Sequence, residues 1–223
     1  MCINRYADDV VAWAPAKVNL HLEVLGKRPD GYHEIATLMV AIRLFDTLVF
    51  RDEPTGDIRL QCTRHGLSTG PDNLVVRAAH LLQQHAGCQR GAAIRLVKRI
   101  PLAAGLAGGS TDAAATLAGL NELWKLGLGR EELANLAARL GSDIPFFLDG
   151  PAAWCSGRGE RVKATPLGAT LDFVLLCPPF GLSTADVYRR VMVQERPESG
   201  EEIRRALATG EVAAIAQAMH NRL

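Results

Sequence analysis

Pro101-Leu102-Ala103-Ala104-Gly105-Leu106-Ala107-Gly108-Gly109-Ser110-Thr111-Asp112 is the stretch around which the rest of the chain is organised. Residues 94–98, just before it, alternate apolar and polar side chains, as a strand does. Apolar residues then recur at helical spacing from Ala113 to Trp124, and Gly127 stands where this helix would end. A loop of small residues therefore joins a strand to a helix.

The small side chains of this loop favour an anion site. Backbone N–H groups in such a loop can approach a ligand closely, and the helix N-terminus behind them carries a partial positive charge. Phosphate suits that arrangement, and Ser110 and Thr111 add hydroxyls for capping the helix or reaching a phosphate-bound metal. The alternative is a helix that packs tightly on a sheet through glycine and alanine. The P-loop and Gly-x-Gly-x-x-Gly patterns are both absent.

Composition limits the class of protein. The 223 residues are 48% hydrophobic and 22% charged, with a net charge of +1, so the chain can bury a core as one large or two smaller domains. Near-neutral charge and only 5% aromatic residues disfavour a nucleic-acid partner. No apolar run reaches the length of a membrane span, and residues 1–13 lack the apolar core of a secretory signal. Five cysteines without a Cys-x-x-Cys pair favour reduced thiols, so we expect a cytoplasmic protein without a membrane partner.

Strict alternation from Ala14 to Val24 predicts a strand that is at least half buried. One face is apolar throughout. The other face carries four polar side chains, those of Lys17, Asn19, His21 and Glu23. That second face could be open to water, but the small residues ahead of Lys17 favour close packing of something against it.

The remaining segments predict a mixture of strands and helices. We expect further strands at 46–50, 58–62 and 171–177, the last of them buried because it is almost continuously apolar. We expect helices from a cap at Asp72 or Asn73 to Gly87, at 131–140, from 184 through 188, and at 212–219. Ser199-Gly200-Glu201-Glu202 is a capping box that would start one more helix, ended by Gly210.

The loop 101–112 resembles the phosphate-binding motif of the GHMP kinases, whose pattern is Pro-x-x-x-Gly-Leu-Gly-(Gly/Ser)-Ser-Ser. Its extended form is most similar to that of the 4-diphosphocytidyl-2-C-methyl-D-erythritol kinase family. The tetrapeptide Asp30-Gly31-Tyr32-His33, a signature of that family, narrows the resemblance to it. Two positions depart from the pattern: Ala107 replaces a glycine, and Thr111 replaces a serine.

The resemblance implies a role for each matching position. Lys17 and Asp143 match the catalytic pair, with Asp143 as the base for the attacking hydroxyl. ATP would be bound by Pro101, Leu102, Ala103, Ala104, Gly105, Leu106, Ala107, Gly108, Gly109, Ser110 and Thr111, with Asn73 and Lys98 completing the nucleotide site. The second substrate would be bound by Asn19, Tyr32, His33, Thr184 and Tyr188. Ser110 is the candidate ligand for Mg²⁺.

The implied fold is α+β. It is a GHMP kinase-like two-domain fold, with a ribosomal-S5-like N-terminal domain that binds ATP (residues 1–158) and an incomplete C-terminal α/β domain (residues 159–223). Family members continue for several tens of residues beyond the position of Leu223, so we expect the chain to be truncated there. Both substrates would lie in a cleft between the two domains.

The implied reaction is ATP-dependent phosphorylation of the 2-hydroxyl of 4-diphosphocytidyl-2-C-methyl-D-erythritol, a step of non-mevalonate isoprenoid synthesis, with ATP and Mg²⁺ as cofactors. The partner would be this small molecule, and the protein would be a monomer or a homodimer. Two alternatives stay open. One is a GHMP kinase for another alcohol, such as homoserine or mevalonate. The other is a nucleotide-binding fragment without catalysis, which the departure at Ala107 and the missing C-terminal segment favour.

Overall fold

The computed structural model describes residues 1–178 and 180–223, without the side chains of 184 and 185. The strands are β1 Cys2–Tyr6, β2 Asp9–Lys27, β3 His33–Glu53, β4 Ile58–Cys62, β5 Gly91–Val97, β6 Ala152–Ser156, β7 Arg161–Ala164 and β8 His220–Asn221. The helices are α1 Leu74–Ala86, α2 Gly108–Trp124, α3 Arg130–Leu140, a 3₁₀ helix Pro145–Leu148, α4 Thr184–Arg189, α5 Glu201–Thr209 and α6 Val212–Ala218. This mixture of sheet and helices is the expected α+β class.

The described residues form two compact units, each built from separate stretches of chain. The first unit contains residues 1–16, 43–101 and 107–148. The second contains residues 17–42, 102–106 and 149–223. Strands β2 and β3 each contribute to both units, because the division falls within them. The sequence-based boundary after residue 158 falls in the turn between β6 and β7, inside the second unit, and it stays a prediction.

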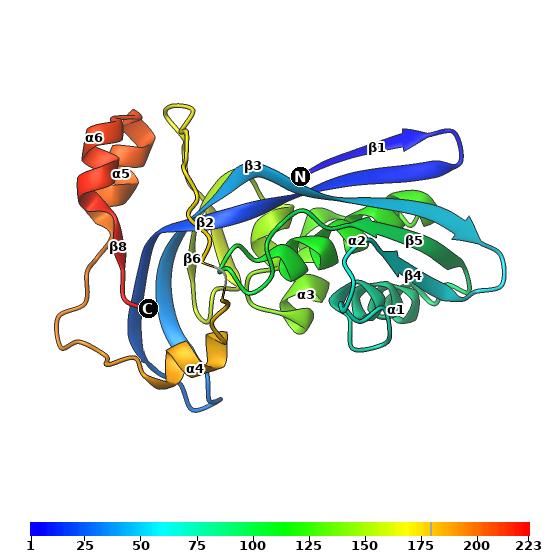
Figure 1. Cartoon of the computed structure of the whole chain (residues 1–223), viewed down its shortest axis with the longest axis horizontal. Helices are drawn as coiled ribbons and strands as arrows, with labels where there is room; N and C mark the ends of the chain where they lie inside the picture. Colours follow the sequence, from blue (N-terminus) through cyan, green and yellow to red (C-terminus); the bar gives the residue numbers. More distant parts are fainter. Residues whose placement is uncertain (179) are drawn as a thin grey trace. The chain divides into compact units, whose positions relative to one another are not determined.

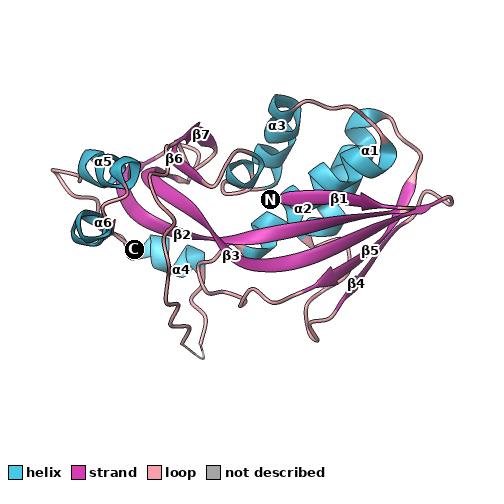
Figure 2. Cartoon of the chain, turned by 90° about the horizontal axis from the view of Figure 1, so that it is seen from above, coloured by secondary structure: helices cyan, strands magenta, loops and turns pink. Residues whose placement is uncertain are grey.

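Three helices cover one face of the sheet in the first unit. Figure 2 shows α1, α2 and α3 on the same side of β3, β5 and β4. Strand β5 pairs antiparallel with β3 and parallel with β4. Helix α2 lies close to the sheet at Gly119, where the ring of Phe50 occupies the space that a Cβ would need. A residue with a side chain would hold the helix farther away. This close approach holds the middle of α2 against β3.

Strand β2 tolerates Pro15 because the neighbouring strand β1 stops pairing with it before that residue. Strand β1 pairs antiparallel with β2 from Tyr6↔Asp9 to Cys2↔Trp13. Pro15 lies just beyond the last of these pairs, so its missing N–H removes no hydrogen bond from that ladder. The strand can therefore continue to Lys27 and carry the predicted alternation through both units.

The second unit is organised around the other halves of β2 and β3. Strand β6 pairs antiparallel with β3 and with β7, and β8 pairs parallel with β2. Figure 1 shows α5 and α6 side by side, and β8 leading to the C-terminal end beside β2. Side chains from β2, β3, β6, α5 and α6 form one apolar core: Leu20, Leu38, Val40, Ala152, Ile203, Ala206, Leu207 and Ile215.

The predicted strand at 171–177 is wrong. Residues 171–178 form no strand, and Val174 and Leu176 are 92% and 90% exposed. Leu171 and Phe173 pack on the apolar core of the second unit, so the segment is anchored by alternate side chains only. A hydrophobic run predicts burial, but a strand also needs a hydrogen-bonding neighbour, and the described residues provide none here.

Three smaller predictions are corrected by the backbone. The strand expected at 46–50 is part of the much longer strand β3. Helix α2 begins at Gly108, inside the loop motif, and ends at Trp124, before Gly127. The capping box is shifted: the residue that precedes α5 is Gly200, in the left-handed region, while Ser199 Oγ accepts a hydrogen bond of 3.3 Å from Glu201 N, the first residue of the helix.

Other predicted ends are confirmed. Asn73 caps α1 by accepting a hydrogen bond from Val75 N, and Gly87 ends that helix with a φ of 58°. Helices α3, α4 and α6 begin and end within one or two residues of the predicted positions. These ends were set by local chemistry that the sequence shows directly.

Candidate active site

The small-residue loop leads into α2 through a left-handed turn. Ala103, Gly105 and Ala107 all have positive φ, and Ala107 is the residue that precedes the first turn of α2, with φ 56° and ψ 33°. No side chain caps this helix start. Gly108 and Gly109 follow, so the first N–H groups of α2 are flanked by backbone alone. Such a helix start can accept an anionic ligand in place of a cap.

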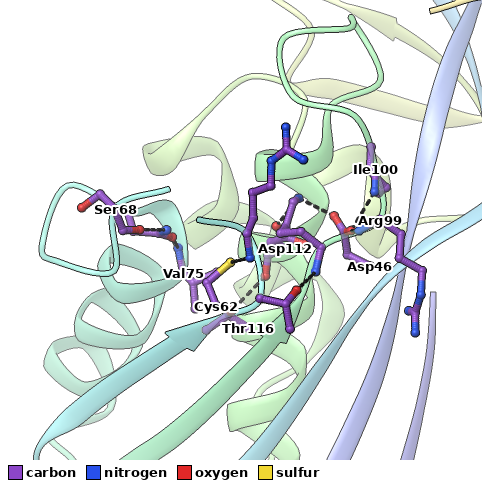
Figure 3. Close-up of polar contacts among 12 residues, drawn as sticks. Asp46, Cys62, Ser68, Val75, Arg99, Ile100, Asp112 and Thr116 are labelled. Atoms are coloured by element: carbon purple, nitrogen blue, oxygen red, sulfur yellow. Dashed lines mark hydrogen bonds and ion pairs between the residues drawn. The ribbon is translucent and has the colours of Figure 1, made fainter. Parts of the chain in front are cut away.

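A buried ion cluster holds the strand and helix that flank the loop. The ammonium group of Lys98, directly after β5, forms ion pairs with Asp46 of β3 and with Asp112 of α2, the latter at 2.8 Å. The side chains of all three residues are at most 3% exposed. Asp46 also accepts hydrogen bonds from the N–H groups of Arg99 and Ile100, at 2.5 and 2.9 Å (Figure 3). One carboxylate thus fixes the backbone where the loop begins.

Gly108 contributes to this arrangement through its lack of a side chain. A Cβ at this position would lie 3.0 Å from the Lys98 ammonium nitrogen and 3.0 Å from a methyl carbon of Ile100. The start of α2 therefore packs directly on the residues that follow β5. Lys98 was predicted to contact ATP. Its ammonium group forms ion pairs with Asp46 and Asp112 in the structure. A contact with the nucleotide stays a prediction.

The environment of the cluster changes the proton affinity of its groups. Burial raises the pKa of Asp112 to about 7, the repulsion of Asp46 adds to this, and the attraction of Lys98 opposes it. Burial by itself would lower the pKa of Lys98, but the two carboxylates outweigh it, so that pKa is raised. Near neutral pH Lys98 is therefore charged, and Asp112 binds a proton more readily than an exposed aspartate does.

Two polar atoms near the start of α2 are buried without a hydrogen-bond partner among the described residues. They are Thr111 Oγ1 and Asp112 Oδ1. Ser110, between the two glycines and Thr111, is partly exposed. The hydroxyls proposed for phosphate or metal binding are therefore present in the first turn, one partly exposed and one enclosed.

Asn73 and Asp143 both precede helices of the first unit. The Asn73 side chain caps α1 and donates a hydrogen bond of 2.6 Å to Ser68 O, so it fixes the loop ahead of that helix. Asp143 is partly exposed and follows α3, two residues before the 3₁₀ helix that begins at Pro145. The nucleotide and catalytic roles of the two residues stay predictions.

The polar face of β2 is covered in the second unit. Lys17, His21 and Glu23 are 6%, 1% and 0% exposed, so a face open to water is excluded. Lys17 N donates a hydrogen bond of 3.1 Å to Leu106 O, at the tip of the phosphate loop. Its ammonium group donates to Asn19 Oδ1 at 2.5 Å. The predicted catalytic lysine is thus tied to the loop through its backbone and to Asn19 through its side chain.

Aromatic side chains gather at the other end of the second unit. The rings of His33 and Tyr188 stack with centroids 5.2 Å apart. Tyr188 also packs on an apolar cluster of Leu22, Val24 and Ile35. The guanidinium of Arg158 lies 4.9 Å from the centroid of the Tyr32 ring, which is 51% exposed. The predicted partners His33 and Tyr188 are therefore adjacent. Thr184 begins α4, and its side chain lies outside the described residues.

The turn that carries Tyr32 is held by a charged network. Arg28 forms ion pairs with Asp30 at 2.9 Å and with Glu34 at 2.7 Å. Glu34 in turn accepts a hydrogen bond from Gly157 N at 3.1 Å. The signature tetrapeptide is therefore held in place by residues on both of its sides.

Sequence analysis missed four residues that organise these groups. Asp46, Thr37, Glu23 and Arg158 were assigned no role. Thr37 is a single polar residue within an apolar stretch of β3, and Asp46 interrupts the apolar residues together with Thr47; these interruptions were the available signal. Glu23 was noted only as part of the polar face of its strand, and Arg158 carried no signal, because Arg222 and Tyr32 lie far away from them in the sequence.

Comparisons with known proteins agree with this arrangement. The family model for the GHMP kinases N terminal domain matches residues 73–151. A 4-diphosphocytidyl-2-C-methyl-D-erythritol kinase of Pelotomaculum thermopropionicum is 48% identical over 96% of this chain and 75% of its own length. The kinase of the same name from Symbiobacterium thermophilum is 50% identical over 92% of this chain and 74% of its own. This chain belongs to the 4-diphosphocytidyl-2-C-methyl-D-erythritol kinase family.

Solved structures place the family within the wider GHMP kinase fold. A crystal structure of a 4-(cytidine 5'-diphospho)-2C-methyl-D-erythritol kinase has a TM-score of 0.72 and 38% identity, covering 90% of this chain and 72% of that one. A homoserine kinase from Cytophaga hutchinsonii has the same TM-score with 16% identity, which shows a shared fold alone. Membership of the family makes this protein a small-molecule kinase that uses ATP. The match at 73–151 spans Asn73, the phosphate loop and Asp143.

Proposed function

We propose that the protein transfers the γ-phosphoryl group of ATP to the 2-hydroxyl of 4-diphosphocytidyl-2-C-methyl-D-erythritol, a step in isoprenoid precursor synthesis. The observation that carries this proposal is the identity of 48–50% to kinases of that name over more than nine-tenths of the chain. The stack of His33 on Tyr188 supports it, because an aromatic surface suits a nucleobase.

Phosphoryl transfer needs positioned groups and positive charge more than covalent chemistry. The open start of α2 would hold phosphate oxygens through its N–H groups, with Gly108 and Gly109 allowing close approach. Lys17 would supply positive charge to the transferred group. Asp143 would accept the proton from the attacking hydroxyl. The acceptor would be held by Asn19 and by the aromatic group of Tyr32, His33 and Tyr188.

Magnesium fits this site as a companion of ATP. The described residues contain no group of three or more His, Cys, Asp or Glu side chains placed to hold a metal ion. Mg²⁺ commonly keeps waters and binds through substrate phosphates, needing few protein ligands. The hydroxyl of Ser110 in the first turn of α2 is the proposed ligand. When bound, the ion would neutralise charge on the phosphate oxygens.

We further propose a cytoplasmic protein that acts as a monomer or a homodimer. All five cysteines are free, which suits a reducing compartment. No helix in the described part of the chain is long and apolar enough to cross a membrane.

A substrate panel tests the proposed reaction. The purified chain is incubated with Mg·ATP and, separately, with 4-diphosphocytidyl-2-C-methyl-D-erythritol, homoserine or mevalonate, while ADP release and phosphorylated product are measured. We expect product from the first compound alone. Product from homoserine or mevalonate would assign the chain to another GHMP kinase activity. ATP binding without turnover of any of the three would show a nucleotide-binding protein instead.

A further inference from the structure

A chain of hydrogen bonds runs from Lys17 into the core of the second unit. The Lys17 ammonium donates to Asn19 Oδ1 at 2.5 Å, and Asn19 Nδ2 donates to Thr37 Oγ1 at 2.8 Å. The Thr37 hydroxyl then donates to the backbone carbonyl of His21 at 2.6 Å. Thr37 lies on β3 and is fully buried, whereas the other three residues belong to β2.

Chemistry fixes the direction of every bond in this chain. An ammonium group only donates, so the side-chain oxygen of Asn19 must face Lys17. The amide nitrogen of Asn19 therefore faces Thr37 and must donate to its hydroxyl. The single proton of that hydroxyl is then left for the carbonyl of His21. Because the carbonyl of His21 can only accept, it commits the Thr37 hydroxyl to accepting from Asn19, and Thr37 thereby favours the same orientation of the Asn19 amide that Lys17 requires.

We infer that Thr37 is a positioning residue for phosphoryl transfer, which it supports by holding the Asn19 amide in the orientation that receives the Lys17 ammonium group. This inference rests on the proposed function, in which Lys17 serves the transferred phosphoryl group. Thr37 itself is too deeply buried to be assigned a substrate contact. Its effect passes through Asn19, and the backbone bond from Lys17 N to Leu106 O restrains the same lysine at its other end.

The isosteric change Thr37→Val tests the inference. Valine keeps the shape but removes the acceptor for Asn19 and the donor for His21 O, whereas Thr37→Ser keeps both. We expect T37V to lower kcat by about 10- to 100-fold, the range expected when a reacting group shifts by about 1 Å. We expect T37S to retain kcat within about threefold of the parent, because the hydrogen bonds persist.

A double-mutant cycle separates positioning from general destabilisation. In an Asn19→Ala background the amide is absent, so T37V has nothing left to orient and should lower kcat by less than about twofold further. If T37V lowered kcat by the same factor in the parent and in the Asn19→Ala background, the inference would be overturned. Thr116→Val is the matched control, because Thr116 is also fully buried and donates to a backbone carbonyl, that of Asp112 in α2. We expect T116V to keep kcat even if it lowers the melting temperature.

A second readout does not depend on turnover. The side-chain amide signals of Asn19, assigned by their loss in N19A, should exchange slowly with solvent in the parent and in T37S, and faster in T37V. Unchanged exchange in T37V would overturn the inference even if the parent phosphorylates none of the tested alcohols. If T37V does not fold, Asn19→Asp replaces it, because aspartate accepts from Lys17 but has no N–H to donate to Thr37. Parental kcat in N19D would overturn the inference.

Discussion

The ammonium group of Lys98 lies 2.8 Å from the carboxylate of Asp112, across the two ends of the phosphate loop. Lys98 follows β5 and Asp112 belongs to the second turn of α2, so this ion pair joins the strand and the helix that flank the loop. Asp46 completes the cluster from β3. The geometry of the open helix start therefore depends on charges buried beneath it.

Lys98→Met should destabilise the first unit strongly. Removing the cation leaves two buried carboxyl groups without their partner, a loss of on the order of 3–5 kcal/mol for a broken buried pair. Urea unfolding measures this loss of stability. Arg59→Met is the control, because Arg59 forms ion pairs with Asp57 and Glu53 near the surface. Such exposed pairs contribute about 1 kcal/mol or less to stability. Equal losses in the two variants would show that the buried cluster contributes no more than a surface pair.

The sequence predicted those parts of the fold whose causes are local. The Asn73 cap, the Gly87 end of α1 and the order β5, loop, α2 all follow from residues within a few positions of one another. Asp46 could not be matched to Lys98 in this way, because the two are 52 residues apart and nothing local links them. The strand prediction at 171–177 was wrong for the same reason, because apolar character does not reveal which strand is available for pairing.

The division into units was also beyond local reasoning. Strands β2 and β3 are each continuous over more residues than the sequence predicted, and both contribute to two compact units. For the site, Asn19 was predicted from the family resemblance, whereas its partner Thr37 was not. A threonine within an apolar strand is equally compatible with a packed methyl group and with a buried hydroxyl, and only the fold decides.

Ala107→Gly should maintain or raise stability and ATP affinity. A left-handed alanine costs about 1–2 kcal/mol, which glycine avoids, while the extra freedom of glycine costs about 0.5–1 kcal/mol. Calorimetric titration with a non-hydrolysable ATP analogue and urea unfolding measure both quantities. Ala104→Gly, in the same loop but outside the left-handed region, should only lose stability. Clear weakening of nucleotide binding in A107G would mean that the Ala107 methyl group makes useful contacts.

Asp143→Asn should lower kcat by about 10²- to 10⁴-fold, the usual range for loss of a general base, while ATP affinity stays close to that of the parent. Asparagine keeps the shape of the side chain but cannot accept the proton at neutral pH. Asp57→Asn, an equivalent change at an exposed position of the first unit, should leave kcat unchanged. Parental turnover in D143N would leave Asp143 with no role beyond the start of the 3₁₀ helix.

Tyr188→Leu should raise the KM for the cytidine-containing substrate by about tenfold or more, because it removes an aromatic surface worth about 1–3 kcal/mol per stacked base. The KM for ATP should change by less than about twofold, since Tyr188 packs with His33 in the second unit. Tyr188→Phe keeps the ring and should retain both constants. If the leucine variant raised the KM for ATP instead, the aromatic group would belong to the nucleotide site.

The pH dependence of stability should report on Glu23. This buried carboxylate accepts two hydrogen bonds from Arg222, at 3.0 and 2.9 Å, and others from Val24 N and Glu198 N. Burial acts to raise its pKa, but Arg222 and the two backbone donors outweigh it and lower the pKa from 4.5 to about 2. Because the folded pKa lies below the unfolded one, the ionised form favours folding. The stabilisation is complete above about pH 5 and is lost as the pH falls towards 2.

The expected size of this effect is on the order of 3 kcal/mol, from the lowering of the pKa from 4.5 to about 2. Urea unfolding of the parent and of Glu23→Gln between pH 7 and pH 2.5 measures it, and the slope of stability against pH should be shallower in E23Q. Asp9→Asn is the control, since Asp9 also has a lowered pKa but pairs with the exposed Arg51, where solvent weakens the interaction. A parent slope equal to that of E23Q would mean that the Glu23 carboxylate gains nothing from Arg222. The parallel pairing of β8 with β2 and the contact of the His220 ring with that of His21 would then hold this end of the chain.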